Sequence, residues 1–349
     1  MLTRYDDCHR VLRDYATFAR DRRRVGADIP DDKLNIQTQD PPEQAALKGI
    51  TTKALNAQRL RQVCADARSL MAEKLEEAAK GGTFDLMQDV AGPAAIQVIN
   101  QVFGVDDFTQ ETYAPIYQGL TRNMDSGLDP SRLPAGRAAG SALRARMDGW
   151  LDARLGGAGM LGVFYRDEEV AQMPQPYVRN TLLATYNAGF STVYASSGAV
   201  IHELLKRGLS EVRALDADDQ SAMALAVDEL LRYTSPAQAT ARVAVVETQI
   251  QDVTIKPGDV LVTMMAAANR DPRKFDNPDE LILDRSPNQH LTFAWGPHVC
   301  LGARLAQAWI AELIRFVLEF GDRLRLSGEE EYMHSATLRN LVRLPAAFV

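Results

Sequence analysis

The feature that most constrains the fold is an uninterrupted helical pattern of roughly 30 residues near the middle of the chain, from Tyr177 to Arg207. At 1.5 Å per residue such a helix is roughly 45 Å long, about the width of a whole domain. Its residues are apolar on nearly every side, whereas a surface helix is apolar on one side only. We therefore expect this helix to cross the middle of one large domain.

Helices dominate the chain before this stretch, and strands are expected only after it. Periodic apolar positions predict helices over the following ranges: 5–14, 58–80, 84–103, 136–155, 219–233 and 303–320. Residues 241–265 alternate β-branched and polar side chains around a Lys-Pro-Gly-Asp turn, and short strands are expected again over 322–349. No linker rich in glycine, serine and proline divides the chain. The sequence therefore predicts a single α+β domain over residues 1–349, mostly α, with small β-sheets late in the chain.

The charge balance excludes several kinds of protein. The 39 basic and 46 acidic residues leave a net charge of −7, the wrong sign for binding nucleic acid or an anionic membrane. No apolar run is long enough to span a bilayer, and the first residues lack the apolar core of a signal peptide. Three widely spaced cysteines, Cys8, Cys64 and Cys300, are typical of a reducing compartment. We therefore expect a cytoplasmic protein without nucleic-acid or membrane partners.

The most informative segment for function runs from Phe293 to Gly302 and leads into the predicted helix 303–320. A cysteine at a helix N-terminus faces free backbone N–H groups and the positive end of the helix dipole, and both favour the thiolate. Gly296 permits a tight turn shortly before Cys300. Cys8 and Cys64 fit the ordinary interpretation, a buried small apolar side chain. The pattern around Cys300 predicts a reactive or ligating thiolate instead.

The spacing of this segment resembles the haem-binding signature of the cytochrome P450 family, Phe-x-x-Gly-x-(His/Arg)-x-Cys-x-Gly. All five constrained positions match: Phe293, Gly296, His298, Cys300 and Gly302. The resemblance implies the cytochrome P450 fold, in which haem b (iron protoporphyrin IX) lies between a long distal helix and a proximal cysteine loop. It also implies that the Cys300 thiolate is the axial ligand of the haem iron, which favours O–O cleavage.

A second motif lies in the central helix. Ala188, Gly189 and Thr192 match the family's (Ala/Gly)-Gly-x-(Asp/Glu)-Thr. The resemblance implies that Gly189 lets the helix lie flat against the porphyrin and that Thr192 hydrogen-bonds the bound oxygen and delivers protons. The alternative is a glycine kink in a core helix with a threonine bonded back to the helix carbonyls.

A third motif concerns the scaffold. Glu229-Leu-Leu-Arg232 resembles the family's Glu-x-x-Arg, and Arg285 supplies the third member of the set. An isolated glutamate and arginine at this spacing would usually be a solvated pair on a helix surface. The resemblance implies instead a buried network that supports the fold behind the haem and takes no part in catalysis.

Three residues match the family's partners of the haem propionates: Lys48, Arg242 and His298. Two buried propionates need about two or three cationic or donor partners. Lys48 stands where family members place an arginine, so it keeps the charge but loses the bidentate geometry. An ordinary surface lysine is the alternative at this position.

The chain departs from the family in two places. The acid that precedes the threonine, and helps to relay protons, is replaced by Ser191. We hypothesise that Asn187 and Ser191, one helical turn apart, hold a water that substitutes for the carboxylate. In addition, Met1 aligns well inside typical bacterial members, so the leading helix and the first strands of the small sheet are expected to be missing. The sheet would then present an open edge.

The resemblance also implies partners. With no flavin or iron–sulfur segment in the sequence, electrons are expected from a ferredoxin-type partner. It would dock on a basic patch formed by Lys48, Arg59, Arg61 and Arg304; the alternative is that these four are ordinary solvated charges. Substrate contacts are expected from the loop 21–39, from residues 106–135, and from individual side chains: Tyr186, Phe190, Tyr194, Gln238 and Thr240.

The predicted function is that of a haem-thiolate monooxygenase that uses O2 to hydroxylate, epoxidise or dealkylate a small-molecule specialised metabolite. The replacement of the usual acid by Ser191 leaves open oxidative coupling or ring closure without oxygen insertion. A non-catalytic haem protein that recruits other proteins is the alternative from another class. Members of that kind usually lose the ligating cysteine or the distal threonine, and both Cys300 and Thr192 are present here.

Overall fold

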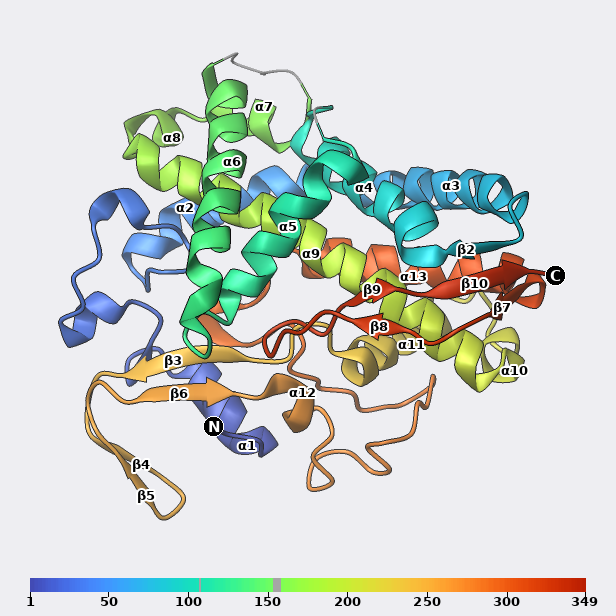
Figure 1. Cartoon of the computed structure of the whole chain (residues 1–349). Coiled ribbons are helices and arrows are strands. Elements are labelled where there is room, and N and C mark those ends of the chain that lie inside the picture. The colour runs from blue at the N-terminus through green and yellow to red at the C-terminus, as the bar shows by residue number, and fades with distance from the viewer. Residues whose placement is uncertain (107, 153–157) are drawn as a thin grey trace.

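The computed structural model describes residues 1–106, 108–152 and 158–349. The longest helix, α9 (Gln175–Arg207), crosses the middle of the molecule, as the sequence predicts (Figure 1). Its first turn contains Pro176, where the missing N–H of proline costs no hydrogen bond. Among the helices of the described residues, none combines the length and apolar character needed to cross a bilayer.

The other helices surround α9. The longer ones are α1 (Tyr5–Arg13), α2 (Glu43–Asn56), α3 (Leu60–Ala79), α4 (Gly92–Phe103), α5 (Gln110–Met124), α6 (Leu133–Asp152), α7 (Gly159–Arg166), α11 (Gln220–Thr234) and α13 (Ala303–Phe320). The shorter ones are α8 (Glu168–Gln172), α10 (Ser210–Arg213) and α12 (Met265–Ala268). Helix α13 has the bounds that the sequence predicts. The predicted helix over 136–155 begins earlier, at Leu133, and residues 153–155 of that prediction lie outside the described residues.

The sheets are small and antiparallel, but they are not built only from late strands. The first has the order β1 (Phe18–Ala19), β3 (Thr240–Ala244), β6 (Val260–Thr263), and the second β2 (Thr83–Asp85), β10 (Pro345–Phe348), β7 (Leu324–Leu326). Two hairpins complete the set: β4 (Thr248–Ile250) with β5 (Val253–Ile255), and β8 (Glu331–Tyr332) with β9 (Leu341–Arg343). The prediction of late sheets is therefore incomplete, since β1 and β2 come from the first quarter of the chain. On its far side β6 meets only an isolated bridge from Leu2 to Thr263.

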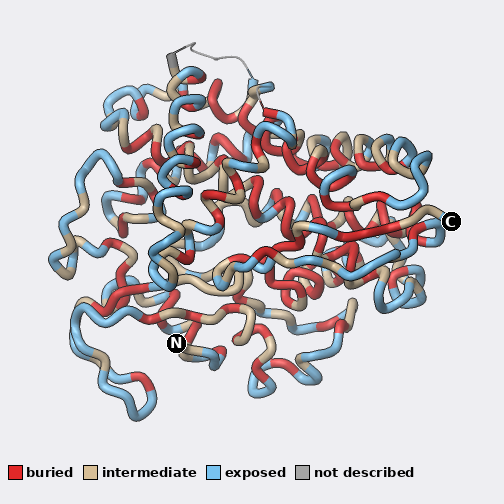
Figure 2. The backbone as a smooth tube through the Cα atoms, viewed as in Figure 1, coloured by how far each residue is buried: buried red, intermediate tan, exposed pale blue. Residues whose placement is uncertain are grey.

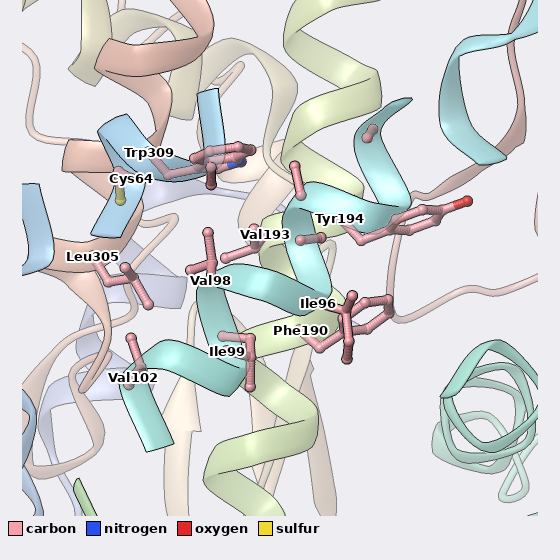
Figure 3. Close-up of a cluster of buried hydrophobic side chains, with 14 of the residues drawn as sticks. Cys64, Ile96, Val98, Ile99, Val102, Phe190, Val193, Tyr194, Leu305 and Trp309 are labelled. Atoms are coloured by element: carbon pink, nitrogen blue, oxygen red, sulfur yellow. The ribbon is translucent and has the colours of Figure 1, made fainter. Parts of the chain in front are cut away.

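The hydrophobic core lies where α9 meets α3, α4 and α13. Figure 3 shows Val193 of α9 beside Val98 of α4, with Trp309 of α13 above them. The Trp309 indole N–H donates to the Ser197 hydroxyl at 3.0 Å, so α13 and α9 are joined by a buried hydrogen bond. Figure 2 shows this central region as mostly buried, whereas the β4–β5 hairpin at the lower left is mostly exposed. The whole length of α13 after Cys300 is thereby anchored against α9.

A buried carboxylate joins α11 to the meander that precedes the cysteine loop. Glu229 accepts both guanidinium bonds of Arg232, at 2.7 and 2.8 Å, and one from Arg285 at 3.0 Å. It also accepts the Ile282 backbone N–H at 2.9 Å and the Asn288 amide at 3.1 Å. Glu229 and Arg232 are completely buried and Arg285 is 8% exposed. The network is therefore a fully enclosed cross-link and is not a solvated surface pair.

A second buried carboxylate fastens the end of α5 to the turn between β8 and β9. Asp125 accepts the Thr337 hydroxyl at 2.6 Å and the backbone N–H groups of Ala336 and Thr337 at 2.9 and 3.1 Å. Arg132 lies 3.3 Å from the same carboxylate. Burial alone would raise the pKa of Asp125, but these hydrogen bonds outweigh it and the pKa lies below its usual value.

We expect Asp125→Asn to lower the free energy of unfolding by about 1–3 kcal/mol at neutral pH, because it weakens bonds to a buried charged acceptor. A carboxyl whose folded-state pKa is depressed stabilises the fold above its unfolded-state pKa and loses that contribution as the pH falls through the folded-state value. The difference between wild type and variant should therefore shrink in acid. Denaturant titrations from pH 7 to pH 3 measure it, with the exposed neighbour Asp129→Asn as the control. A difference that is independent of pH would contradict this assignment.

Candidate active site

The cysteine loop is a tight, internally hydrogen-bonded turn that ends at α13. The Cys300 backbone N–H donates to the Phe293 carbonyl at 2.8 Å, and the Val299 N–H donates to the Gly296 carbonyl at 3.0 Å. These bonds hold the loop closed without contribution from the side chain of Cys300. The sulfur is thus carried on a rigid turn directly before the helix.

Cys300 differs from the other two cysteines in its environment. Cys8 and Cys64 are fully buried, and burial raises the pKa of each to about 12, so they behave as small apolar side chains, as the sequence indicates. Cys300 is free and exposed. Surrounding atoms still desolvate its thiol and raise its pKa, while the Gly302 backbone N–H and the charge of Lys48 act in the opposite direction. The chain therefore offers the sulfur the two partners that stabilise a thiolate.

The two glycines of the signature have different roles in the structure. Gly296 has φ 74°, and a Cβ there would lie 2.8 Å from the Leu12 carbonyl oxygen, so the turn requires glycine to pass the end of α1. At Gly302 a Cβ would meet no atom of the chain within 4 Å. Gly302 is instead the N-cap of α13, and its backbone N–H bonds the Cys300 sulfur.

On α9, one exposed residue interrupts a buried helix. Between Tyr177 and Leu205 every described residue of α9 is buried or half-buried except Thr192. The Thr192 hydroxyl donates to the Ala188 carbonyl at 2.9 Å, which leaves its oxygen lone pairs free to accept a hydrogen bond. Ala188 and Gly189, one turn earlier, are half-buried on this side. The middle of α9 thus presents a small, flat face that bears one accessible hydroxyl.

Gly189 has a packing role within the chain as well. A Cβ at this position would lie 2.8 Å from Cδ1 of Ile99 on α4, closer than real Cβ contacts allow. Ile99 is 1% exposed and belongs to the core cluster of Figure 3. The glycine is therefore needed for the close approach of α9 and α4, in addition to the flat face that the sequence analysis expects of it.

The three aromatic residues expected to touch substrate do not lie on this face. Tyr186, Phe190 and Tyr194 are at most 2% exposed and stack in a cluster with Tyr113 and other rings of α5 and α4. At 100° per residue, Phe190 lies about 200° around the helix from Thr192. These side chains point into the core, away from Thr192, so their placement gives no support to the predicted contact with substrate.

Asn187 and Ser191 lie at the edge of the same aromatic cluster. The Ser191 hydroxyl donates to the Asn187 carbonyl at 2.6 Å, and the Asn187 side-chain oxygen accepts the Tyr113 hydroxyl at 3.1 Å. Ser191 is 4% exposed. Each side chain can form a further hydrogen bond, because the Asn187 amide can donate its N–H groups and the Ser191 hydroxyl oxygen can accept. The hypothesis of a shared water stays a prediction.

A cluster of charged side chains lies between β3 and the cysteine loop. Arg242 is 2% exposed, and its guanidinium donates only to the Thr240 hydroxyl and the Ala241 carbonyl, at 3.3 and 2.8 Å. Burial and the charge of Arg20 lower the pKa of Arg242 to about 9, which still leaves it a cation at neutral pH. His298 lies 2.9 Å from Asp40, and burial lowers its pKa although Asp40 acts to raise it.

Lys48 is not placed as the propionate partner that the sequence predicts. Its ammonium group donates to the Pro297 carbonyl and, at 3.2 Å, to the Val299 carbonyl, so it binds the cysteine loop itself. Burial lowers the pKa of Lys48, whereas the nearby Cys300 raises it. Gln44, one turn earlier, also donates to the Pro297 carbonyl, at 3.2 Å. Gln44 and Lys48 of α2 therefore position the cysteine loop. Lys48 is half-buried and points inward, so it does not belong to an exposed docking patch.

The polar pair expected to orient substrate is occupied within the chain. The Gln238 amide donates to the Ser235 carbonyl at 2.6 Å. The Thr240 hydroxyl accepts from Arg20 at 2.6 Å and from Arg242 at 3.3 Å. Thr240 therefore orients two guanidinium groups and is not a free partner for substrate. Arg20 and Asp40 were missed by the sequence analysis, because no local pattern marks a residue whose partners lie more than 200 positions away.

The remaining basic residues of the predicted patch are exposed. Arg59 and Arg61 lie at the start of α3, and Arg304 lies in the first turn of α13. Arg304 donates to the Asn56 side chain at 3.3 Å, which links the end of α2 to the helix that follows Cys300. These three arginines are near the cysteine loop in the fold, with Lys48 excluded.

The residues present fit the haem group that the sequence signature implies. An exposed thiol stands at the start of α13, a flat helix face with an accessible hydroxyl stands on α9, and the buried guanidinium of Arg242 on β3 lies near that of Arg20, with Asp40 as the carboxylate that acts on both. Among the described residues, no group of three or more His, Cys, Asp or Glu side chains is arranged to hold a metal ion. A single thiolate combined with cationic partners for two carboxylates is the donor set that an iron porphyrin requires.

Comparison with known proteins agrees with this donor set. The family model described as Cytochrome P450 matches residues 167–320. The biotin biosynthesis cytochrome P450 of Bacillus subtilis is 30% identical over 267 residues, which cover 76% of this chain and 67% of that protein. The 6-deoxyerythronolide B hydroxylase of Saccharopolyspora erythraea is 28% identical over 281 residues, covering 78% and 67%. The crystal structure of CalO2 superposes with a TM-score of 0.84 at 25% identity and covers 100% of this chain and 90% of its own. With this fold, this site and these relatives, the chain belongs to the cytochrome P450 family and is a haem b-dependent monooxygenase.

Proposed function

We propose that this enzyme oxidises a small-molecule specialised metabolite with O2 and electrons from a ferredoxin-type partner, and that Cys300 is its axial thiolate. The observation that carries the proposal is the contrast among the cysteines: only Cys300 is exposed, on a rigid loop at a helix N-terminus, while Cys8 and Cys64 are buried. The relatives include a hydroxylase of 6-deoxyerythronolide B and a 20-oxo-5-O-mycaminosyltylactone 23-monooxygenase, which supports a functionalised natural product as substrate.

Individual residues of the chain have separate roles around the proposed haem site. When bound, haem supplies the oxygen-activating chemistry, with Cys300 as its ligand and Arg242 and His298 as partners of its carboxylates. Burial raises the pKa of the Cys300 thiol, and the Gly302 N–H and the charge of Lys48 act in the opposite direction, because both stabilise negative charge on sulfur. Phe293, half-buried above the loop, limits the access of water to this side. On the opposite side, Thr192 holds its hydroxyl hydrogen on the Ala188 carbonyl and offers its oxygen as an acceptor.

The site on the distal side also governs proton supply. Asn187 is held by Tyr113, and Ser191 is held by the Asn187 carbonyl. Both side chains are therefore fixed near Thr192, since Ser191 directly precedes it and Asn187 lies one turn before Ser191. A water that accepts from the Asn187 amide and donates to the Ser191 oxygen would place a proton carrier beside the threonine. Ser191 replaces the carboxylate that the family has at this position, which leaves open reactions that remove hydrogen from substrate without inserting oxygen. Oxidative coupling or ring closure is therefore the second candidate reaction.

The surface on which the electron donor would dock is inferred from the position of exposed basic side chains. The exposed Arg59, Arg61 and Arg304 lie around the helix ends nearest the cysteine loop, and an acidic ferredoxin would be attracted to them in spite of the net charge of −7. These arginines therefore support docking of the reductant there.

The carbon monoxide difference spectrum of the reduced, haem-loaded protein tests the proposal. A thiolate-ligated haem is expected to show the Soret band characteristic of the family, and a library of macrolide precursors, fatty acids and aromatic metabolites is then screened for compounds that shift the ferric spin state. A protein that takes up no haem, or that shows the band of a histidine-ligated haem, would refute the proposal.

Ser191→Asp tests the proton-relay interpretation. We expect product formation per electron consumed to stay equal or to rise by up to about threefold, because a carboxylate replaces the water. Peroxide release and product are measured together, with Ser196→Asp, a buried serine elsewhere on α9, as the matched control. A collapse of turnover in Ser191→Asp alone would show that an acid is not tolerated at this position.

A further inference from the structure

Arg20 is a partly buried cation that neither the sequence signature nor the site described above uses. Its Nη1 donates to the Thr240 hydroxyl at 2.6 Å, and its Nε donates to the Gln37 carbonyl at 2.8 Å. Desolvation by the surrounding protein lowers the pKa of the guanidinium, and Asp40 acts in the opposite direction. Two hydrogen bonds therefore hold the guanidinium group in a desolvated position, where its positive charge is energetically unfavourable.

The strand register places Arg20 against Arg242. In the antiparallel pair of β1 and β3, Phe18 pairs with Ala244 and Ala19 with Val243, so one further step sets Arg20 opposite Arg242. Like charges directly across a strand pair repel, and burial increases the repulsion. The two guanidinium groups also share the Thr240 hydroxyl as acceptor. The fold therefore holds two cations together against their repulsion.

Asp40 is the carboxylate of this cluster, and its oxygens already accept hydrogen bonds from other groups. It accepts the backbone N–H groups of Arg20 and Asp21, at 3.1 and 3.0 Å, and lies 2.9 Å from His298 and 3.5 Å from Arg24. Among the described residues, its hydrogen bonds do not include one from the guanidinium group of Arg20 or of Arg242. A single carboxylate also cannot balance two guanidinium charges. The pair thus requires further negative charge of about one to two units from a bound carboxylate.

We propose that Arg20 and Arg242 form a paired-guanidinium site for carboxylates of the haem, with Arg20 as an additional cofactor-anchoring residue. The inference rests on the proposed function, since it needs haem at the cysteine loop. Arg20 offers its remaining N–H groups beside those of Arg242, and Thr240 sets the spacing of the two groups. The segment after β1 that carries Arg20 would then hold the cofactor together with the cysteine loop.

The test measures how long the protein retains haem. Haem transfer from the ferric enzyme to excess apomyoglobin is followed for wild type, Arg20→Gln and Arg22→Gln, an exposed arginine of the same segment. We expect Arg20→Gln to lose haem about tenfold faster, which corresponds to about 1.4 kcal/mol, and Arg22→Gln to match wild type. The reduction potential should also fall in Arg20→Gln, because removing a nearby positive charge favours the ferric state.

Arg20→Lys keeps the inference testable if Arg20→Gln does not fold. Lysine preserves the charge but cannot bond Thr240 and Gln37 together with a carboxylate, so its haem loss should be intermediate. Haem retention and potential equal to wild type in Arg20→Lys and in any folded Arg20→Gln would overturn the inference. A variant that retains haem normally and loses only the spin-state response to laurate would also overturn the inference. In that case the arginines would bind the carboxylate of a substrate and not that of the haem. Wild-type protein that takes up no haem would instead refute the proposed function.

Discussion

Cys300→Ser is expected to abolish the thiolate-type Soret band of the reduced carbon monoxide complex and to reduce monooxygenase turnover to background. Serine keeps the size and the backbone bond from residue 300 to the Phe293 carbonyl, so the loop should stay closed. Its hydroxyl, however, is not ionised at neutral pH, and the axial ligand loses the negative charge that favours O–O cleavage. Absorbance spectra of ferric, ferrous and carbon monoxide forms measure the change directly.

The other cysteines provide the matched control for this prediction. Cys64 is completely buried between α3 and α13, and Cys64→Ala should cost at most about 1–2 kcal/mol of stability while leaving the spectrum intact. Unfolding curves for both variants separate a loss of ligand from a loss of fold. An unchanged Soret band in Cys300→Ser would mean that another residue binds the iron.

Glu229→Gln is expected to lower the free energy of unfolding by about 3–5 kcal/mol, a loss large enough to unfold many single-domain proteins. The substitution leaves Arg232, which is completely buried, and Arg285, which is 8% exposed, without the carboxylate that neutralises them. It also replaces one of the two acceptor oxygens by an NH2 group, which then faces other N–H donors, such as those of Arg232 and Asn288. Denaturant unfolding of the purified variant, monitored by circular dichroism, gives the loss.

A surface ion pair serves as the comparison. Lys74 and Glu77 form an exposed pair at the same i, i+3 spacing, and Lys74→Gln should leave the unfolding curve unchanged within error. The contrast isolates burial, because the two pairs share their spacing and their chemistry. A loss in Glu229→Gln below about 1 kcal/mol would show that the buried network is not what stabilises this region.

Local patterns predicted a large part of this architecture. The bounds of α13 and the path of α9 follow from apolar periodicity, and the tight turn at Gly296 follows from its place before the cysteine. Helix α5 was missed because Pro115 lies inside it and interrupts the pattern. Strands β1 and β2, of two and three residues, are too short to show alternation and exist only because distant strands pair with them.

The sequence by itself determined the chemistry at Cys300, because a thiol, its glycine turn and the following helix start are all set by neighbours within a few residues. It also determined which residues are charged in the network around Glu229. Only the tertiary structure decided which way a side chain faces: Phe190 points into the core, Lys48 turns onto the cysteine loop, and Arg20 stands beside Arg242. Helix rotation and strand pairing are set by packing between segments far apart in the chain, and that information is absent from any short stretch of residues.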